Sequence, residues 1–183
     1  MAMKFPKKEN SRMKRFIDAI GEAVKDKNWL AAVALSLTMP DVCGGMEQPQ
    51  HKSEKRYTAW WDKYMLNQYP VLSSADAFAL RCAYLHEGGS YQRARKALTE
   101  NHFVVWKEGS SPRRRTARKV RNMIATSRGK NVQPRILEVD AFCTQISNAV
   151  ERWSNDVRAD QAVQGRLQSL LEIHELETAR PPQ

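Results

Sequence analysis

An arginine and a histidine five positions apart are the residues of this chain best suited to chemistry. Arg81 and His86 lie within SSADAFALRCAYLHEGG, residues 73–89. Histidine can act as an acid or a base near neutral pH, and arginine keeps its charge while binding two phosphate oxygens at once. The pair suits cleavage of RNA by its own 2′-hydroxyl, which needs a base, an acid and a cation for the phosphorane charge.

The stretch that carries this pair is predicted to be one helix. It begins at a serine cap, Ser73 or Ser74, and ends at Gly88-Gly89, where a left-handed residue can close it. Five residues of an ideal helix turn about 500°, so the side chains of Arg81 and His86 project roughly 140° apart. Because arginine is long and His86 lies in the last turn, the two can still converge. The alternative is that each faces a second copy of the chain.

The other elements that must position this helix are also mostly helical. Apolar residues at three- and four-residue spacing predict helices at 11–27, 28–39, 53–69, 137–157 and 160–177. The second is apolar nearly all round, which indicates burial, and we expect Pro40 to end it and 41–51 to form a loop. The third has a stripe of mostly aromatic residues, and we expect it to form core and a dimer seam rather than a base-stacking surface: Tyr57, Trp60, Trp61, Tyr64 and Met65.

The segment near 100–134 differs from the rest. Residues 91–101 are predicted to form a short basic helix or turn, and 102–106 a strand. A hairpin of 101–107 with 120–126 is our interpretation of the remainder. The fold class is therefore mainly α, a bundle of four or five main helices with a basic, two-stranded insertion near 100–134. We expect one domain over 11–177, a frayed basic N-terminus over 1–10 and a tail over 178–183.

Arginine, four to six residues and then histidine, late in a helix of a helical chain, resembles the signature of the HEPN family. The resemblance covers roughly residues 11–88 and 137–157. It implies a HEPN-like bundle and a metal-independent endoribonuclease without a cofactor, of the sort found in toxin or antiphage systems. It further implies that Arg81 binds the scissile phosphate, that His86 is the acid or base, and that a homodimer supplies the second histidine. The motif ALRCAYLHEG also resembles an uncharacterised bacterial family, which adds no function.

One departure from the family keeps other interpretations open. HEPN nucleases often carry a polar residue such as asparagine directly after the arginine, and this chain has Cys82 there. An inactive HEPN-like protein that binds nucleic acid or acts as an adaptor is therefore an alternative. On a purely structural interpretation, Arg81 pairs with Asp76, Glu87 or another acid, and His86 is a helix-terminal residue favoured by the helix dipole.

The charge of the chain points to a polyanionic partner. Lysine and arginine exceed the acidic residues by 30 − 20 = 10, which favours RNA or another nucleic acid as the partner. The most basic segment predicts a phosphate-binding arm, with a solvated loop as the alternative; its residues are Arg113, Arg114, Arg115, Arg118, Lys119 and Arg121.

The remaining residues restrict the classes of protein. The three cysteines, Cys43, Cys82 and Cys143, are far apart, which predicts free thiols in a reducing cytoplasm rather than a disulfide framework. No histidine and carboxylate cluster has metal-ligand spacing. No apolar run is expected to cross a bilayer, so we expect a cytoplasmic protein without membrane contact. An interaction scaffold with a protein partner is a third hypothesis.

Overall fold

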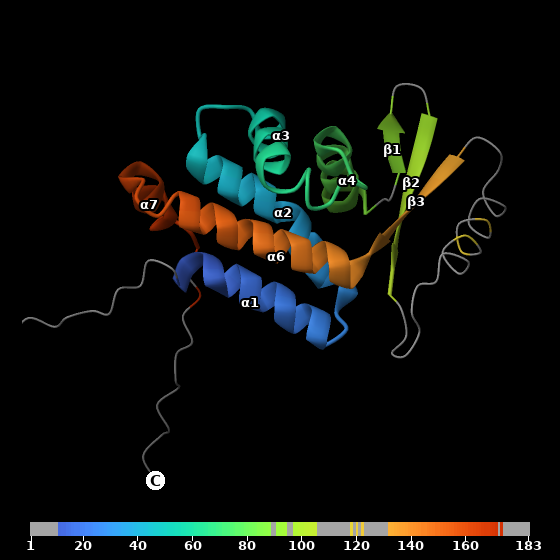
Figure 1. Ribbon diagram of the computed structural model, residues 1–183, viewed down its shortest axis with the longest axis horizontal. Helices are drawn as coiled ribbons and strands as arrows, with labels where there is room; N and C mark the ends of the chain where they lie inside the picture. Colours follow the sequence, from blue (N-terminus) through green and yellow to red (C-terminus); the bar gives the residue numbers. More distant parts are fainter. Residues whose placement is uncertain are drawn as a thin grey trace, which may run out of the picture.

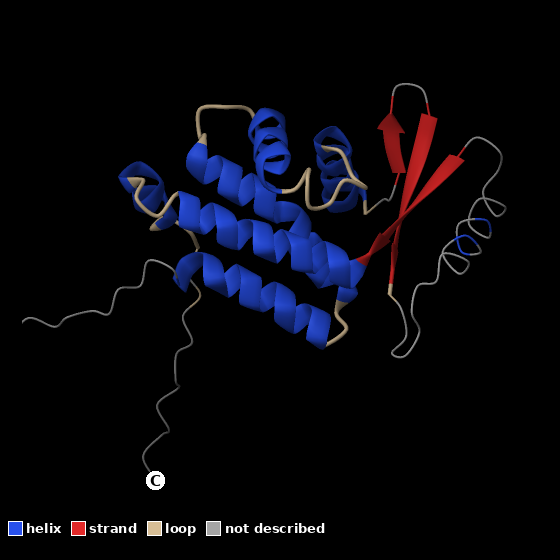
Figure 2. Ribbon diagram, viewed as in Figure 1, coloured by secondary structure: helices blue, strands red, loops and turns tan. Residues whose placement is uncertain are grey.

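The chain folds into a helical bundle with a small sheet at one end (Figure 1). The structure is a computed structural model, and it describes residues 11–88, 91–94, 97–105, 118, 120, 122, 132–171 and 173. Its elements are α1 Ser11–Lys25, α2 Trp29–Glu47, α3 Ser53–Tyr64, α4 Ser74–Glu87, β1 Tyr91–Ala94, β2 Ala97–Val104, β3 Val132–Glu138, α6 Val139–Asp156 and α7 Gln161–Leu167. Figure 2 shows that helices dominate, so the predicted mainly α bundle is confirmed.

Helix α6 is the central element of the bundle. It lies between α1 and α2 and packs against both (Figure 1). The apolar face predicted for it is confirmed, since all seven of its residues are buried: Val139, Phe142, Cys143, Ile146, Val150, Trp153 and Val157. The Phe142 ring contacts the rings of Trp61, Tyr69 and Phe103 at centroid distances of 6.5, 5.7 and 5.5 Å. Because Phe103 belongs to β2, these contacts join the sheet to the helices.

Helix α3 supplies the aromatic part of the core. The predicted core is confirmed, because each ring is at most 5% exposed. The predicted dimer seam at these rings is wrong, because they are already buried within one chain. The helix ends at Tyr64, five residues before the predicted end at Tyr69. The Trp61 Nε1–H donates to the Leu72 carbonyl at 3.1 Å. The chain after α3 therefore folds back over Trp61 instead of continuing as a helix.

The predicted end of α2 at Met39 is wrong. The helix continues through Pro40 to Glu47, so residues 41–47 of the predicted loop are helical. A proline inside a helix removes one hydrogen bond and costs about 3 kcal/mol. That cost is offset here because Met39 and Cys43, on either side of Pro40, are fully buried.

The extension also makes α2 longer than the apolar segment predicted from the sequence. With 19 residues, α2 is long and apolar enough to cross a membrane by length and composition, the one such helix in the described part of the chain. Within the bundle it packs against α1, α3, α4, α6 and α7. Contact on several sides is consistent with apolar residues on several faces of the helix.

The sheet has three strands in the order β1-β2-β3, and two predictions fail there. Residues 91–94 and 97–101 are strand rather than helix or turn, and β1 pairs antiparallel with β2. The predicted hairpin with 120–126 is also wrong. β2 instead pairs in parallel with β3, from Leu98 opposite Val132 to Val104 opposite Glu138, while residues 120 and 122 are helical. Pairing between segments distant in sequence overrides the helix propensity of arginine, lysine and alanine.

The last helix is shorter than predicted. α7 ends at Leu167 instead of about residue 177. Val163 and Leu167 are buried as expected, whereas Leu171 is 79% exposed and lies beyond the helix. Arg12 donates to the Gln168 carbonyl at 3.1 Å, and Arg15 donates to the Leu171 carbonyl, so α1 holds this end of the chain. The terminal segments 1–10 and 178–183 lie outside the described residues.

Candidate Arg81/His86 site

Helix α4 places the two candidate residues near its C-terminus. The Ser73 side chain accepts from the Asp76 amide at 3.2 Å, which caps the start of the helix as predicted. Gly88 closes the other end in the left-handed conformation, with φ of 61°. A non-glycine residue is strained there, so the glycine fixes where the helix stops and holds His86 in its last turn.

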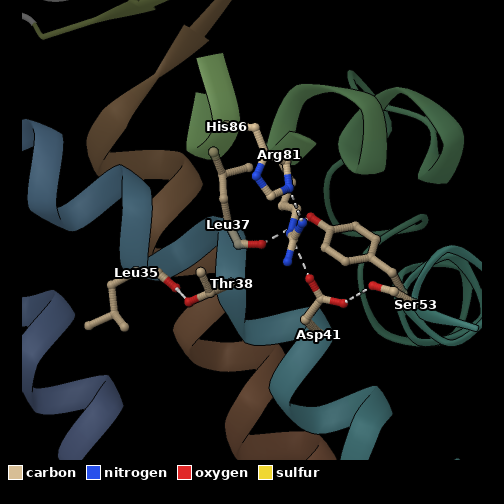
Figure 3. Close-up of polar contacts among 8 residues, drawn as sticks. Leu35, Leu37, Thr38, Asp41, Ser53, Arg81 and His86 are labelled. Carbon is tan, nitrogen blue, oxygen red and sulfur yellow. Dashed lines mark hydrogen bonds and ion pairs between the residues drawn. The ribbon is translucent and has the colours of Figure 1, made fainter. Parts of the chain in front are cut away.

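Arg81 and His86 converge. The Arg81 Nη1 lies 3.3 Å from the His86 Nε2, although the two positions are about 140° apart around an ideal helix (Figure 3). The length of the arginine side chain bridges that angle. Of the two arrangements considered from the sequence, convergence within one chain is the one that the structure contains.

The contact sets the roles of the two nitrogens. A guanidinium has only donors, so Arg81 donates and the His86 Nε2 accepts through its lone pair. A ring that accepts at Nε2 carries its proton on Nδ1. The His86 residue is exposed, and the Arg81 side chain is 20% exposed. A lone pair on a solvent-accessible imidazole is what a general base requires.

A carboxylate that the sequence did not single out completes the site. The Asp41 Oδ2 lies 2.6 Å from the Arg81 Nε, and the Asp41 Oδ1 accepts from the Ser53 hydroxyl at 2.6 Å (Figure 3). Asp41 is on α2, Ser53 on α3 and Arg81 on α4, so one carboxylate joins three helices. The Asp41 side chain is 12% exposed, which makes this a largely buried ion pair.

A buried phenol lies close enough to Asp41 and Arg81 to be affected by their charges. Tyr57 is fully buried, and its hydroxyl donates to the Leu37 carbonyl at 3.3 Å. Burial raises the pKa of Tyr57 well above its ordinary value, and the nearby Asp41 charge raises it further. The raised pKa favours the neutral phenol at Tyr57.

The acid that pairs with Arg81 is not the nearest one in sequence. Asp76 instead accepts from Arg135 of β3 at 2.7 Å, and this pair ties the start of α4 to the sheet. The Glu87 side chain lies outside the described residues. Asp41 was missed because it follows Pro40 in a segment that we assigned to a loop; continuing the α2 periodicity past the proline would have placed it on a helix.

The other candidate residues lie elsewhere. Arg118 is helical and exposed, whereas the rest of the predicted arginine-rich arm falls outside the described residues: Arg113, Arg114, Arg115, Lys119 and Arg121. His51, in the turn before α3, and His102, on β2, are half-buried, and His174 is also outside the described residues.

The cysteines are free thiols, as predicted. Cys43 and Cys143 are buried and Cys82 is half-buried. Among the residues that the structure describes, no three histidine, cysteine or acidic side chains are grouped so that they could hold a metal ion.

Exposed apolar residues flank the site. The Tyr84 hydroxyl of α4 donates to the Leu30 carbonyl at 3.0 Å, which brings the start of α2 beside the end of α4. Leu30 is 73% exposed, and Leu85, next to His86 in the chain, is 37% exposed.

Comparisons of the chain with protein-family models, with curated proteins and with solved structures find no match.

Proposed function

We propose that this chain is a HEPN-type, metal-independent endoribonuclease whose site is built from Arg81 and His86. The single observation that supports this proposal is the 3.3 Å contact between Arg81 Nη1 and His86 Nε2 at the exposed end of α4. A permanent cation and a titratable imidazole that share one solvent-accessible position match the needs of phosphodiester cleavage.

In the proposed reaction, His86 takes the proton from the 2′-hydroxyl of RNA. The 2′-oxygen forms a bond to phosphorus, the bond from phosphorus to the 5′-oxygen breaks, and the leaving oxygen receives a proton. The products are a 2′,3′-cyclic phosphate and a 5′-hydroxyl. Arg81 binds the non-bridging oxygens, where negative charge develops in the phosphorane. The exposed His86 ring turns away from Arg81 Nη1, which frees its Nε2 lone pair for the 2′-hydroxyl.

The reaction also needs an acid, and one copy of the site has one histidine. We propose that a second copy of the chain supplies it, so that the active form is a homodimer. The exposed Leu30 and Leu85 beside the site support an interface at this position. The net charge of +10 favours attraction of RNA. A cytoplasmic protein of a toxin or antiphage system is the corresponding biological setting.

The test of this function is RNA cleavage in EDTA. We expect the wild type to cut an RNA oligonucleotide and to leave 2′,3′-cyclic phosphate ends, because the 2′-oxygen is the nucleophile. His86→Ala should abolish cutting, whereas Asp18→Asn, which alters an exposed carboxylate paired with Lys14 on α1, should cut at the wild-type rate. Circular dichroism checks that each variant is folded.

Two results would contradict the proposal. One is cleavage that persists in His86→Ala, and the other is cleavage that stops when EDTA removes divalent ions. An oligonucleotide with a 2′-deoxy sugar at the cut site must also resist, since it has no nucleophile.

The second candidate function is binding of nucleic acid without cleavage. The ion pair with Asp41 favours it, because a carboxylate at 2.6 Å offsets the arginine charge that a phosphate would need. The same assay separates the two functions. A binding protein would retain RNA with no new ends, would lose affinity when Arg113, Arg114 and Arg115 become alanine, and would be indifferent to His86→Ala.

A further inference from the structure

We propose that Asp41 is a positioning residue for Arg81 and that Ser53 restricts Asp41 to a single contact with the guanidinium. This inference rests on the proposed ribonuclease function. It adds an account of what holds the Arg81 guanidinium in position to bind a phosphate. It assigns a role to two residues, on α2 and α3, that lie far from the Arg81/His86 motif in the sequence.

The two oxygens of Asp41 have separate partners. Oδ1 accepts from the Ser53 hydroxyl at 2.6 Å, and Oδ2 lies 2.6 Å from the Arg81 Nε (Figure 3). Both Oδ2 and Nε are shielded from solvent, and their approach does not have the alignment of a hydrogen bond. The attraction is therefore that of an ion pair in a shielded position, where charges interact more strongly than at the surface.

The single contact leaves most of the guanidinium available. A carboxylate with both oxygens free pairs with arginine through two parallel N–H···O bonds and occupies one whole edge of the guanidinium. Here the bond to Ser53 opposes that geometry. Nε faces Asp41, Nη1 contacts His86, and Nη2 has no partner among the described residues. The nitrogen without a partner is the donor that we assign to the incoming phosphate.

The arrangement also restrains a flexible side chain. Fixing a free arginine side chain costs about 2 kcal/mol in rotamer entropy. That free energy corresponds to roughly a 30-fold change in a binding or rate constant. Asp41 fixes Arg81 before RNA binds, so the activation free energy of cleavage does not include this entropy cost. A catalytic group that is misplaced by about 1 Å can cost about 100-fold in rate.

The first arm of the test is kinetic. Asp41→Asn keeps the shape of the side chain and removes its charge, and we expect the cleavage rate at saturating RNA to fall about 100-fold. Affinity for a 2′-O-methyl RNA, which cannot be cut, should change little. Asp41→Glu, which restores the carboxylate, should recover part of the rate. Asp18→Asn is the control, because that carboxylate is exposed and pairs with Lys14 on α1 at 2.6 Å.

Ser53→Ala tests the restriction separately. Once the Ser53 hydroxyl is gone, Asp41 can turn and take a second donor of Arg81. We expect affinity for the 2′-O-methyl RNA to fall about tenfold, which corresponds to the loss of one charge-assisted hydrogen bond to the phosphate.

A second arm needs no RNA and no activity. The Nε–H resonance of Arg81, observed by nitrogen-edited NMR, should shift and exchange faster with solvent in Asp41→Asn and should remain unchanged in Asp18→Asn. If the wild type cuts no RNA, the ribonuclease proposal fails, while this readout still decides whether Asp41 positions Arg81.

Three results would overturn the inference. The first is an Arg81 Nε–H resonance in Asp41→Asn that matches the wild type. The second is a cleavage rate in Asp41→Asn equal to that of Asp18→Asn. The third is faster cleavage in Asp41→Asn, which would make Asp41 a competitor of the phosphate.

Discussion

The three thiols differ in their distance from solvent, and this difference can be measured. Burial raises the pKa of Cys43 well above its ordinary value, and the charge of Glu47 raises it further. Burial also raises the pKa of Cys143. A raised pKa leaves less thiolate at any pH below it, and the thiolate is the reactive form.

We therefore expect one thiol, that of Cys82, to react with a thiol reagent at pH 8 in the folded protein. The other two should react only after denaturant is added, and raising the pH to 9 should not expose them. Cys82→Ser should remove the rapid phase. Three thiols that react equally fast in the folded protein would contradict this assignment.

At the scale of single residues, the sequence identified the pair but not its surroundings. Arg81 and His86 could be selected because their types suit phosphate chemistry and their spacing places them near one helix end. Helical geometry alone left their convergence open, because the tip of an arginine can travel around the helix surface. Asp41 could not be found from spacing, since it is 40 positions from Arg81 and reaches it only through the packing of α2 against α4.

At the scale of elements, the approach of α2 to α3 depends on one glycine. A Cβ added at Gly44 would lie 2.7 Å from the Arg56 carbonyl oxygen of α3, which is closer than such atoms ever approach. At Gly45, the nearest atom to an added Cβ is the Arg56 Cζ at 3.7 Å, an ordinary contact at the end of a flexible side chain. The two neighbouring glycines form a matched pair for substitution.

We expect Gly44→Ala to lower the free energy of unfolding by about 1–3 kcal/mol, because the backbones of α2 and α3 must separate. Gly45→Ala should leave it unchanged or raise it by about 0.5–1 kcal/mol, since alanine is the better helix former. Urea unfolding measures both. Equal stabilities of the two variants would show that the helices do not meet closely at Gly44.

The errors in the predicted elements share one cause. Pro40 normally ends a helix, and arginine, lysine and alanine normally favour one, so local rules placed 41–47 in a loop that ran to 51 and a short helix or turn at 91–101. The structure instead has helix and strand there, because burial of Cys43 and pairing of β2 with β3 decide the outcome. In α6 the apolar residues recur at helical spacing over several turns, and the buried face predicted from them is confirmed.

At the scale of the whole molecule, the exposed leucine beside His86 tests the proposed dimer. We expect the wild type to sediment as a dimer and Leu85→Glu to sediment as a monomer with no cleavage activity, because a charge would be buried at the interface. Leu66→Glu is the control, since Leu66 is 41% exposed in the turn after α3, on a different element. A wild type that is monomeric at micromolar concentration would contradict the dimer.

The parallel pairing of β2 and β3 has a practical consequence for anyone who wishes to delete the arginine-rich segment. Val104 lies opposite Glu138, whereas β3 begins at Val132, opposite Leu98. The two ends to be rejoined are therefore about 20 Å apart, from six strand steps of about 3.3 Å. A tight turn cannot span that gap, and a replacement linker needs at least about six extended residues. A shortened chain with a smaller linker would pull the strands out of register, so substitution of the arginines is the cleaner way to remove their charge.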